Sequence, residues 1–209
     1  MEVWLKYQLT PDLYQSDHNA IRINSRQKNI KTYIALFRGI NVGGKNILPM
    51  KELVVILENL GCRNVKTCIQ SGNVVFQSED SNTTGLSSRI GVEVRKSHGF
   101  EPYVLLMRFT ELDKAITANP FPEAESKPAT LHLGFLASAP GNPDLKALEG
   151  LKIASERFHL RKNLFYLHAP EGIGRSKLAA KVERLLGVTM TTRNWRTVCK
   201  IRDMVNEPG

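Results

Sequence analysis

The order of short apolar runs and helical patterns over residues 32–109 restricts the fold more than any other feature of this chain. The run "TYIALF" is long enough for a buried strand, and apolar residues at helical spacing follow it over residues 50–60. Two further strand patterns, "VKTCIQS" and "VVFQS", flank Gly72-Asn73, a dipeptide typical of a tight hairpin. A helical pattern over residues 84–98 and the run "EPYVLLMRF" complete the series. This strand–helix–strand–strand–helix–strand order is that of a ferredoxin-like sheet.

The second half of the chain repeats part of this order. A short helix is predicted before Asn119-Pro120, then a strand at "ATLHLGFLAS", a short helix at "NPDLKALEGL" and a hairpin made of "SERFHL" and "LFYLHA". Helices are predicted at "SKLAAKVERLLG" and "TTRNWRTVCKIRDMVN", the latter capped by Thr191 or Thr192. In this half a final helix is predicted where the fourth strand of the first half stands.

The predicted fold class is therefore α+β, with two ferredoxin-like α/β halves whose antiparallel sheets are packed by helices. Residues 1–31 are irregular and polar, and they predict a flexible or loosely docked N-terminal extension. Residues 32–109 predict the first half, and residues 110–209 the second.

Composition favours a cytoplasmic protein. Hydrophobic residues make up 42% of the chain and charged residues 23%, as in ordinary globular proteins. No apolar run approaches the roughly 20 residues of a membrane helix, so we expect no membrane partner, and the N-terminus lacks the apolar core of a signal peptide. Three cysteines without close spacing indicate reduced thiols. The five histidines form no ligand array, so no metal or other cofactor is predicted.

The formal net charge of +9 is unevenly placed. Residues 158–209 carry ten Lys or Arg residues and four Asp or Glu residues. Such a patch favours an anionic partner, which could be a nucleotide, a nucleic acid or another anionic ligand. The alternative is that these basic side chains only keep the surface soluble.

The stretch "RGINVGGKN", residues 38–46, follows the first predicted strand directly. Its glycines allow backbone N–H groups to turn toward a ligand, and Arg38 and Lys45 can neutralise an anion. The helix that begins near Pro49 adds unpaired N–H groups and a positive dipole end. The stretch fits neither the Walker A pattern nor Gly-x-Gly-x-x-Gly. A ligand-binding loop and a purely structural turn both remain open.

The predicted topology brings this loop close to a second polar motif. In a ferredoxin-like sheet the first two strands run parallel, and the third returns between them. The end of strand one and the turn between strands two and three then lie at the same edge. This places "RGINVGGKN" beside "QSGN", residues 70–73.

The stretch "PEGIGRSK", residues 170–177, is the next candidate. Ser176 can cap the following helix, and Arg175 and Lys177 flank the start of that helix. This combination suits the recognition of phosphate or carboxylate. An ordinary capped helix with surface cations would contain the same residues.

In "TTRNW", residues 191–195, Arg193 and Asn194 offer planar donors and Trp195 offers a stacking face. Trp195 also lies near the apolar side of its predicted helix, so a core position is the preferred interpretation for this ring.

The sequence shows no recognisable catalytic constellation. Ser71 or Ser176 could act as a nucleophile only with a base that the sequence does not assign. The polar motifs hold almost no carboxylates, and such a composition suits anion binding better than acid–base chemistry. An enzyme acting on a small anionic substrate, and a purely structural role for the motifs, remain alternatives. The predicted ligand-binding set is Arg38, Asn41, Gly43, Gly44, Lys45, Gln70, Ser71, Asn73, Arg175, Ser176, Lys177, Arg193, Asn194 and Trp195.

The segments "YIALFRGINVGGKN", "PMKEL", "TCIQSGNVVF", "NPF", "GIGRSKL" and "TTRNWRTV" occur in the order in which a known bacterial family has them. From about Tyr33 to Val205 the chain resembles the domain of unknown function 1697 family. The resemblance implies two ferredoxin-like α+β halves and no established activity. The family's signature positions correspond here to Arg38, Gly39, Asn41, Gly43, Gly44, Lys45, Gln70, Ser71, Gly72, Asn73, Asn119, Pro120, Phe121, Gly174, Arg175, Ser176, Lys177, Thr192, Arg193, Asn194 and Trp195.

Two positions depart from the family pattern. Cys68 stands where the family usually has tyrosine before "IQSGN", and Arg196 stands where "RNWNT" is common. Any role of that tyrosine hydroxyl is therefore in doubt for this chain.

Overall fold

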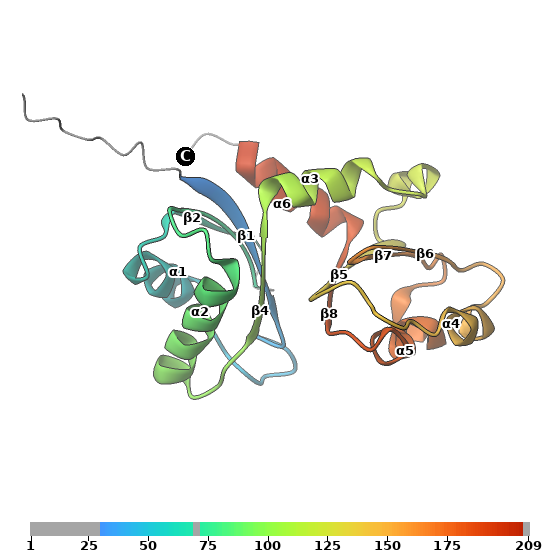
Figure 1. Ribbon diagram of the computed structural model, residues 1–209, viewed down its shortest axis with the longest axis horizontal. Helices are drawn as coiled ribbons and strands as arrows, with labels where there is room; N and C mark the ends of the chain where they lie inside the picture. Colours follow the sequence, from blue (N-terminus) through green and yellow to red (C-terminus); the bar gives the residue numbers. More distant parts are fainter. Residues whose placement is uncertain (1–29, 69–71, 207–209) are drawn as a thin grey trace, which may run out of the picture.

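The computed structural model describes residues 30–68 and 72–206. The predicted extension therefore lies almost wholly outside the described residues, as do Gln70 and Ser71. The first half forms a four-stranded antiparallel sheet in the order β2-β3-β1-β4 (Figure 1), which confirms the predicted ferredoxin-like arrangement. Its elements are β1 (Lys31–Arg38), α1 (Met50–Asn59), β2 (Arg63–Cys68), β3 (Asn73–Ser78), α2 (Thr83–His98) and β4 (Tyr103–Arg108).

The second half has the same strand order, β6-β7-β5-β8, in a second antiparallel sheet. Each half also ends in a helix that follows its last strand directly, α3 after β4 and α6 after β8. The elements that follow β4 are α3 (Phe109–Thr117), η1 (Pro122–Ser126), β5 (Leu131–Leu136), α4 (Leu145–Leu151), β6 (Arg157–Arg161), β7 (Leu164–His168), η2 (Ile173–Arg175), α5 (Lys177–Leu186), β8 (Met190–Asn194) and α6 (Trp195–Asn206).

Strand β8 corrects the sequence prediction of one continuous helix over "TTRNWRTVCKIRDMVN". This strand pairs antiparallel with β5, so the second half does contain a fourth strand. The predicted caps Thr191 and Thr192 are wrong, because Asn194 Oδ1 accepts the hydrogen bond from Thr197 N (2.9 Å) at the start of α6. Two consecutive β-branched threonines favour an extended backbone, and a polar strand is tolerated at the edge of a sheet.

The alternation of side chains along β1 explains how the layers form. Tyr33, Ala35 and Phe37 pack with α1 and α2, whereas Ile34 and Leu36 point to the opposite face. The first sheet is therefore apolar on both faces. In the second sheet one face packs against α4 and α5 in the same manner.

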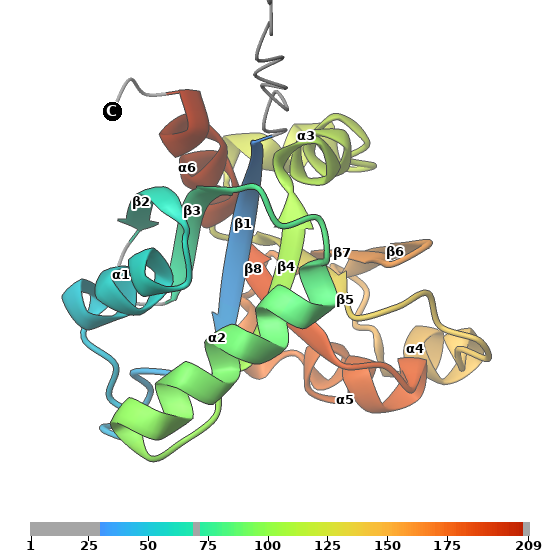
Figure 2. The ribbon, with the colours of Figure 1, turned by 60° about the vertical axis from the view of Figure 1, so that its left-hand side comes forward.

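The inner faces of the two sheets share one core with α3 and α6. Leu36 and Leu105 of the first sheet belong to the same apolar cluster as Leu133, Tyr166 and Trp195 of the second half. Figures 1 and 2 show α3 and α6 side by side at one end of the gap between the sheets. Burial of this apolar area joins the halves into one body. No helix within residues 30–68 and 72–206 is both long and apolar enough to cross a membrane.

Gly72, directly before β3, contacts the end of β1. Phe37 N donates a hydrogen bond to Gly72 O (2.8 Å), which confirms the predicted proximity of the two motifs. Gly72 has φ +69°, and a Cβ atom there would lie 2.7 Å from Ile40 Cδ1 and from Phe37 Cβ. Only glycine fits both the backbone conformation and the space.

We expect the substitution Gly72→Ala to lower the free energy of unfolding by about 2 to 4 kcal/mol, from left-handed strain and overpacking together. Gly99→Ala is the matched control, because Gly99 has φ +77° but open space around its Cα, so only the conformational cost of about 1 kcal/mol remains. Urea denaturation measures both values, and equal losses would contradict the steric argument.

Candidate functional site

A cleft of about 800 Å³ lies between the two halves at the end of β1. The first half contributes Phe37 and the start of the "RGINVGGKN" loop, and the second half contributes α5, β8 and the first turn of α6. We call it the basic cleft, and it is lined by residues 37–42, Ala179, Ala180, Glu183, residues 190–194 and Thr197. The structure thus brings two of the four predicted motifs, "RGINVGGKN" and "TTRNW", to one site.

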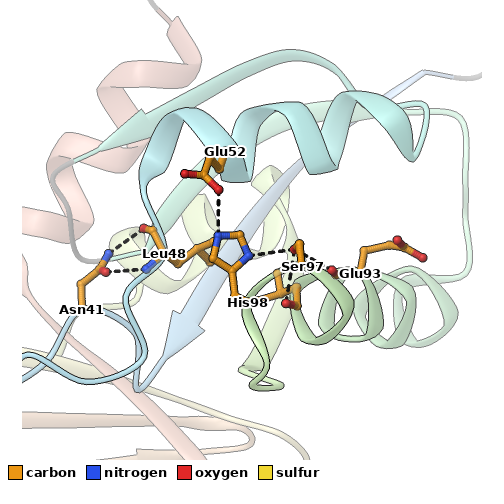
Figure 3. Close-up of polar contacts among 7 residues, drawn as sticks. Asn41, Leu48, Glu52, Glu93, Ser97 and His98 are labelled. Carbon is orange, nitrogen blue, oxygen red and sulfur yellow. Dashed lines mark hydrogen bonds and ion pairs between the residues drawn. The ribbon is translucent and has the colours of Figure 1, made fainter.

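Two asparagines hold the loop after β1 in a fixed shape. Asn41 Oδ1 accepts a hydrogen bond from Leu48 N (2.8 Å), and Asn41 Nδ2 donates to Leu48 O (2.9 Å), as Figure 3 shows. Asn46 Nδ2 donates to Gly39 O (2.8 Å). Both asparagines have positive φ, which this residue type tolerates better than most others. The loop is therefore braced by its own side chains, and the amide of Asn41 is engaged with backbone.

Arg38 lies at the mouth of the basic cleft and forms an ion pair with Glu183 of α5 (Nη1 to Oε1, 2.7 Å). The two side chains are 44% and 38% exposed, so water screens their attraction and the pair contributes less than about 1 kcal/mol. Glu183 is the one acid among the residues that line the cleft. The pair is weak enough for an anion to compete for Arg38.

Arg193 on β8 is largely buried and connects the second half to the first. Its Nε donates to Asn73 Oδ1 (2.5 Å), and its Nη2 donates to Phe37 O (2.7 Å). Its Nη1 donates to Thr192 O (2.9 Å). Burial lowers the pKa of Arg193 to about 10, so the guanidinium stays protonated at neutral pH. One largely buried cation therefore connects β1, β3 and β8.

Several residues of the predicted ligand-binding set serve the fold. Asn73 is fully buried beneath Arg193. The side chains of Ser176 and Asn194 cap α5 and α6, the former by accepting from Ala179 N (3.0 Å). Trp195 is 2% exposed in the shared core, so its ring does not reach a ligand and the core interpretation holds.

The remaining predicted residues lie outside the lining of the cleft. Gly43, Gly44 and Lys45 are exposed farther along the loop, and Arg175 and Lys177 are exposed at the start of α5. The "PEGIGRSK" motif therefore precedes α5, which lines the cleft, but does not line the cleft itself. Cys68, which replaces the usual tyrosine, is buried in the shared core.

Tyr103 is a residue that the sequence analysis missed. It is the Cα partner of Arg38 across the β1–β4 ladder, and its side chain is 38% exposed. Burial raises the pKa of Tyr103, Arg38 lowers it and Glu183 raises it, so the phenol lies within electrostatic reach of the ion pair. The only available signal was its position at the start of "EPYVLLMRF", across from the end of the first strand.

A second cleft of about 870 Å³ occupies the equivalent place between β4, α3 and the end of β5. Its walls are largely apolar, and its rim holds cations together with two acids. We call it the second cleft, and its charged residues are Glu111, Asp113, Lys114, Arg161 and Lys162. This mixture gives no clear preference for an anion or a cation.

His132 lies behind the basic cleft, on the face of β5 that packs toward α5. It borders a small cavity of about 20 Å³ that shares Ala179, Met190 and Thr192 with the cleft. The side chain is 6% exposed, and its Nε2 has no hydrogen-bond partner among the residues that the structure describes. Burial lowers the pKa of His132, although a hydrogen bond to the backbone of Ala129 raises it. The imidazole is therefore neutral at pH 7.

A second polar cluster has the chemical order of a catalytic triad but not its setting. His98 Nδ1 lies 2.7 Å from Ser97 Oγ, and His98 Nε2 lies 3.0 Å from Glu52 Oε2 (Figure 3). Ser97 Oγ also donates to Glu93 O within α2, and neither cleft is lined by these residues. The cluster ties α1 to α2. In the part of the chain that the structure describes, no three His, Cys, Asp or Glu residues gather as metal ligands.

Comparison with known proteins agrees with the sequence motifs. The family model "Protein of unknown function (DUF1697)" matches residues 30–166. The chain belongs to this family. Among solved structures, the conserved bacterial protein SP0830 from Streptococcus pneumoniae is 26% identical with a TM-score of 0.62, over 84% of this chain and 99% of that one. A search of curated proteins finds no match.

The DUF1697 match includes the β1 loop and Asn73, but it ends within β7. The α5 and β8 walls of the basic cleft lie beyond the matched region. The similarity to SP0830 supports the α+β fold over the 84% of this chain that it covers.

The substitution Arg193→Met should lower the free energy of unfolding by at least about 2 kcal/mol, because two buried acceptors lose their donor. Arg38→Met, which breaks an exposed pair, should cost less than about 1 kcal/mol. Urea denaturation of both variants measures the difference. Equal losses would show that Arg193 does not hold the halves together.

Stability should decrease as the pH falls through about 6.5, because His132 has a lower pKa in the folded chain than its ordinary value when unfolded. The unfolded chain then binds the proton first, and the folded state loses stability down to the folded-state pKa. His132→Gln should reduce the slope of the free energy of unfolding against pH. A smaller slope should remain, because the pKa of His168 is also lowered in the folded chain. Chemical denaturation between pH 5 and 8 tests this, and an unchanged slope would contradict it.

Proposed function

We propose that the basic cleft binds a phosphate-bearing ligand, either a nucleotide or a nucleic acid. The observation that carries the proposal is the charge of the segments that form and border the cleft. Residues 38–46, 175–184 and 191–197 together hold eight Lys or Arg residues and one acid, Glu183. The whole chain has a net charge of +9, so most of its excess surrounds this site.

The shape of the cleft supports the same proposal. Its volume is in the range of ordinary small-ligand sites. The "RGINVGGKN" loop is braced before any ligand arrives, which lowers the entropy lost on binding. Arg38 is half exposed at the mouth, and its weak pair with Glu183 can exchange for a phosphate.

A purely structural role explains some residues of the predicted ligand-binding set, but it does not explain the positive charge around the cleft. Asn73 and Arg193 hydrogen bond to each other between the halves, and Ser176 and Asn194 cap helices. Lys177, Lys181 and Arg184 form no ion pair within the described residues, so internal pairing does not explain their presence. An anionic ligand does explain it.

Removal of the two members of the ion pair should have opposite effects on binding. Arg38→Gln should weaken the binding of ATP and tripolyphosphate at low salt by about tenfold, because a charge-assisted hydrogen bond is lost. Glu183→Gln should strengthen it several-fold by removing the repulsive carboxylate. Isothermal titration calorimetry measures both, and melting curves check that each variant is folded.

If the Arg38–Glu183 pair is purely structural, neither substitution should change the affinity for ATP or tripolyphosphate. If ATP, tripolyphosphate and a single-stranded oligonucleotide all fail to bind the wild-type protein at low salt, the proposed function is wrong.

A further inference from the structure

We propose that the ligand of the basic cleft is a single strand of nucleic acid, with its phosphates along α5 and one base stacked on Tyr103. This inference rests on the proposed function and names the ligand class. A free nucleotide would need only the cleft, whereas a strand needs a path that continues beyond it. Three features of the surface provide that path.

The first feature is a row of cations on the outer face of α5. Lys177, Lys181 and Arg184 recur at spacings of four and three residues, so they lie on one side of the helix and extend over about 10 Å. Arg175 precedes them. None of these four side chains forms an ion pair within residues 30–68 and 72–206. The row is available to a polyanion.

The second feature is that this row adjoins the cleft. On the helical wheel Ala180 and Glu183 face the cleft, and Arg184 and Lys177 come next around the helix. A shallow groove of about 470 Å³ shares Ala180 and Glu183 with the cleft and continues past Arg184 toward residues 187–189. The site is therefore elongated along α5 and does not end at the cleft wall.

The third feature is an exposed aromatic ring at the mouth. Tyr103 is the one aromatic residue among the exposed large hydrophobic side chains of the described residues. It sits beside Arg38 across the strand ladder, and Arg38 reaches Glu183 on α5. An exposed ring next to a guanidinium is the pairing on which unpaired bases stack. A duplex would not offer such a base.

Fluorescence anisotropy with labelled single-stranded DNA and RNA of about a dozen nucleotides tests the proposal, against a duplex of the same sequence. The single strands should bind at least about tenfold more tightly than ATP or the duplex at low salt, since the strand contacts both α5 and Tyr103.

The variants are designed as matched pairs. Lys177→Gln, Lys181→Gln and Arg184→Gln together should weaken strand binding at least about tenfold. They should also reduce the slope of log affinity against log salt by about 2, because three phosphate contacts are lost. The triple variant Lys114→Gln, Arg161→Gln and Lys162→Gln removes the same charge at the second cleft and should change both values much less.

The ring is tested separately. Tyr103→Phe should keep strand affinity, whereas Tyr103→Ala should lower it by about tenfold, which is the loss of one stacked base. Circular dichroism confirms that each variant is folded.

The possible outcomes separate the two proposals. If ATP binds but the strand binds no more tightly, or if the two triple variants behave alike, a nucleic-acid ligand is excluded while the proposed function stands. If Tyr103→Ala binds like the wild type, the stacking position is overturned. If neither ATP nor any strand binds, both proposals fail.

Discussion

The peptide group of Phe37 is the point on which the site depends. Its N–H donates to Gly72 O in the β2–β3 turn, and its carbonyl accepts from Arg193 on β8. Three segments that are far apart in the sequence therefore meet at one residue at the end of β1. Because the guanidinium of Arg193 is largely withdrawn from water, its hydrogen bonds offset the loss of hydration, and its partners hold β8 against the first sheet. The basic cleft exists because these hydrogen bonds hold its walls at a set distance.

Local patterns determine most of the fold, so the sequence could predict it. The "TYIALF" run, the helical spacing after Pro49 and the Gly72-Asn73 dipeptide each favour one kind of element, and their order leaves one strand topology. That topology also predicted the contact between the β1 loop and the β2–β3 turn. Strand β8 was missed because its polar residues have no alternating apolar pattern, and its threonines also suit a helix cap. Pairing with β5, a non-local contact, decides its conformation.

The candidate site was harder to predict for the same reason. Residue types indicated which side chains can bind an anion, but not which of them the fold itself uses. Asn73 and Ser176 look alike in the sequence as polar residues of glycine-containing motifs, yet each is hydrogen bonded to a neighbouring group. Tyr103 belongs to no sequence motif, and only the pairing of β1 with β4 places it beside Arg38. Burial and pairing across the sheet are global properties that a local motif does not contain.

The two halves share one topology, so each cleft has a counterpart in the same chain. The basic cleft is built from the end of β1, β8 and α6, and the second cleft from the end of β5, β4 and α3. The loop after β5, residues 137–144, contains no Lys or Arg, whereas β1 ends at Arg38 and the loop that follows it contains Lys45. If the two clefts carried the same side chains, a ligand could bind across the two halves in either direction. Because the charged side chains of the two clefts differ in kind and position, the two directions are not equivalent, and a ligand with two unlike ends would be held in a single orientation.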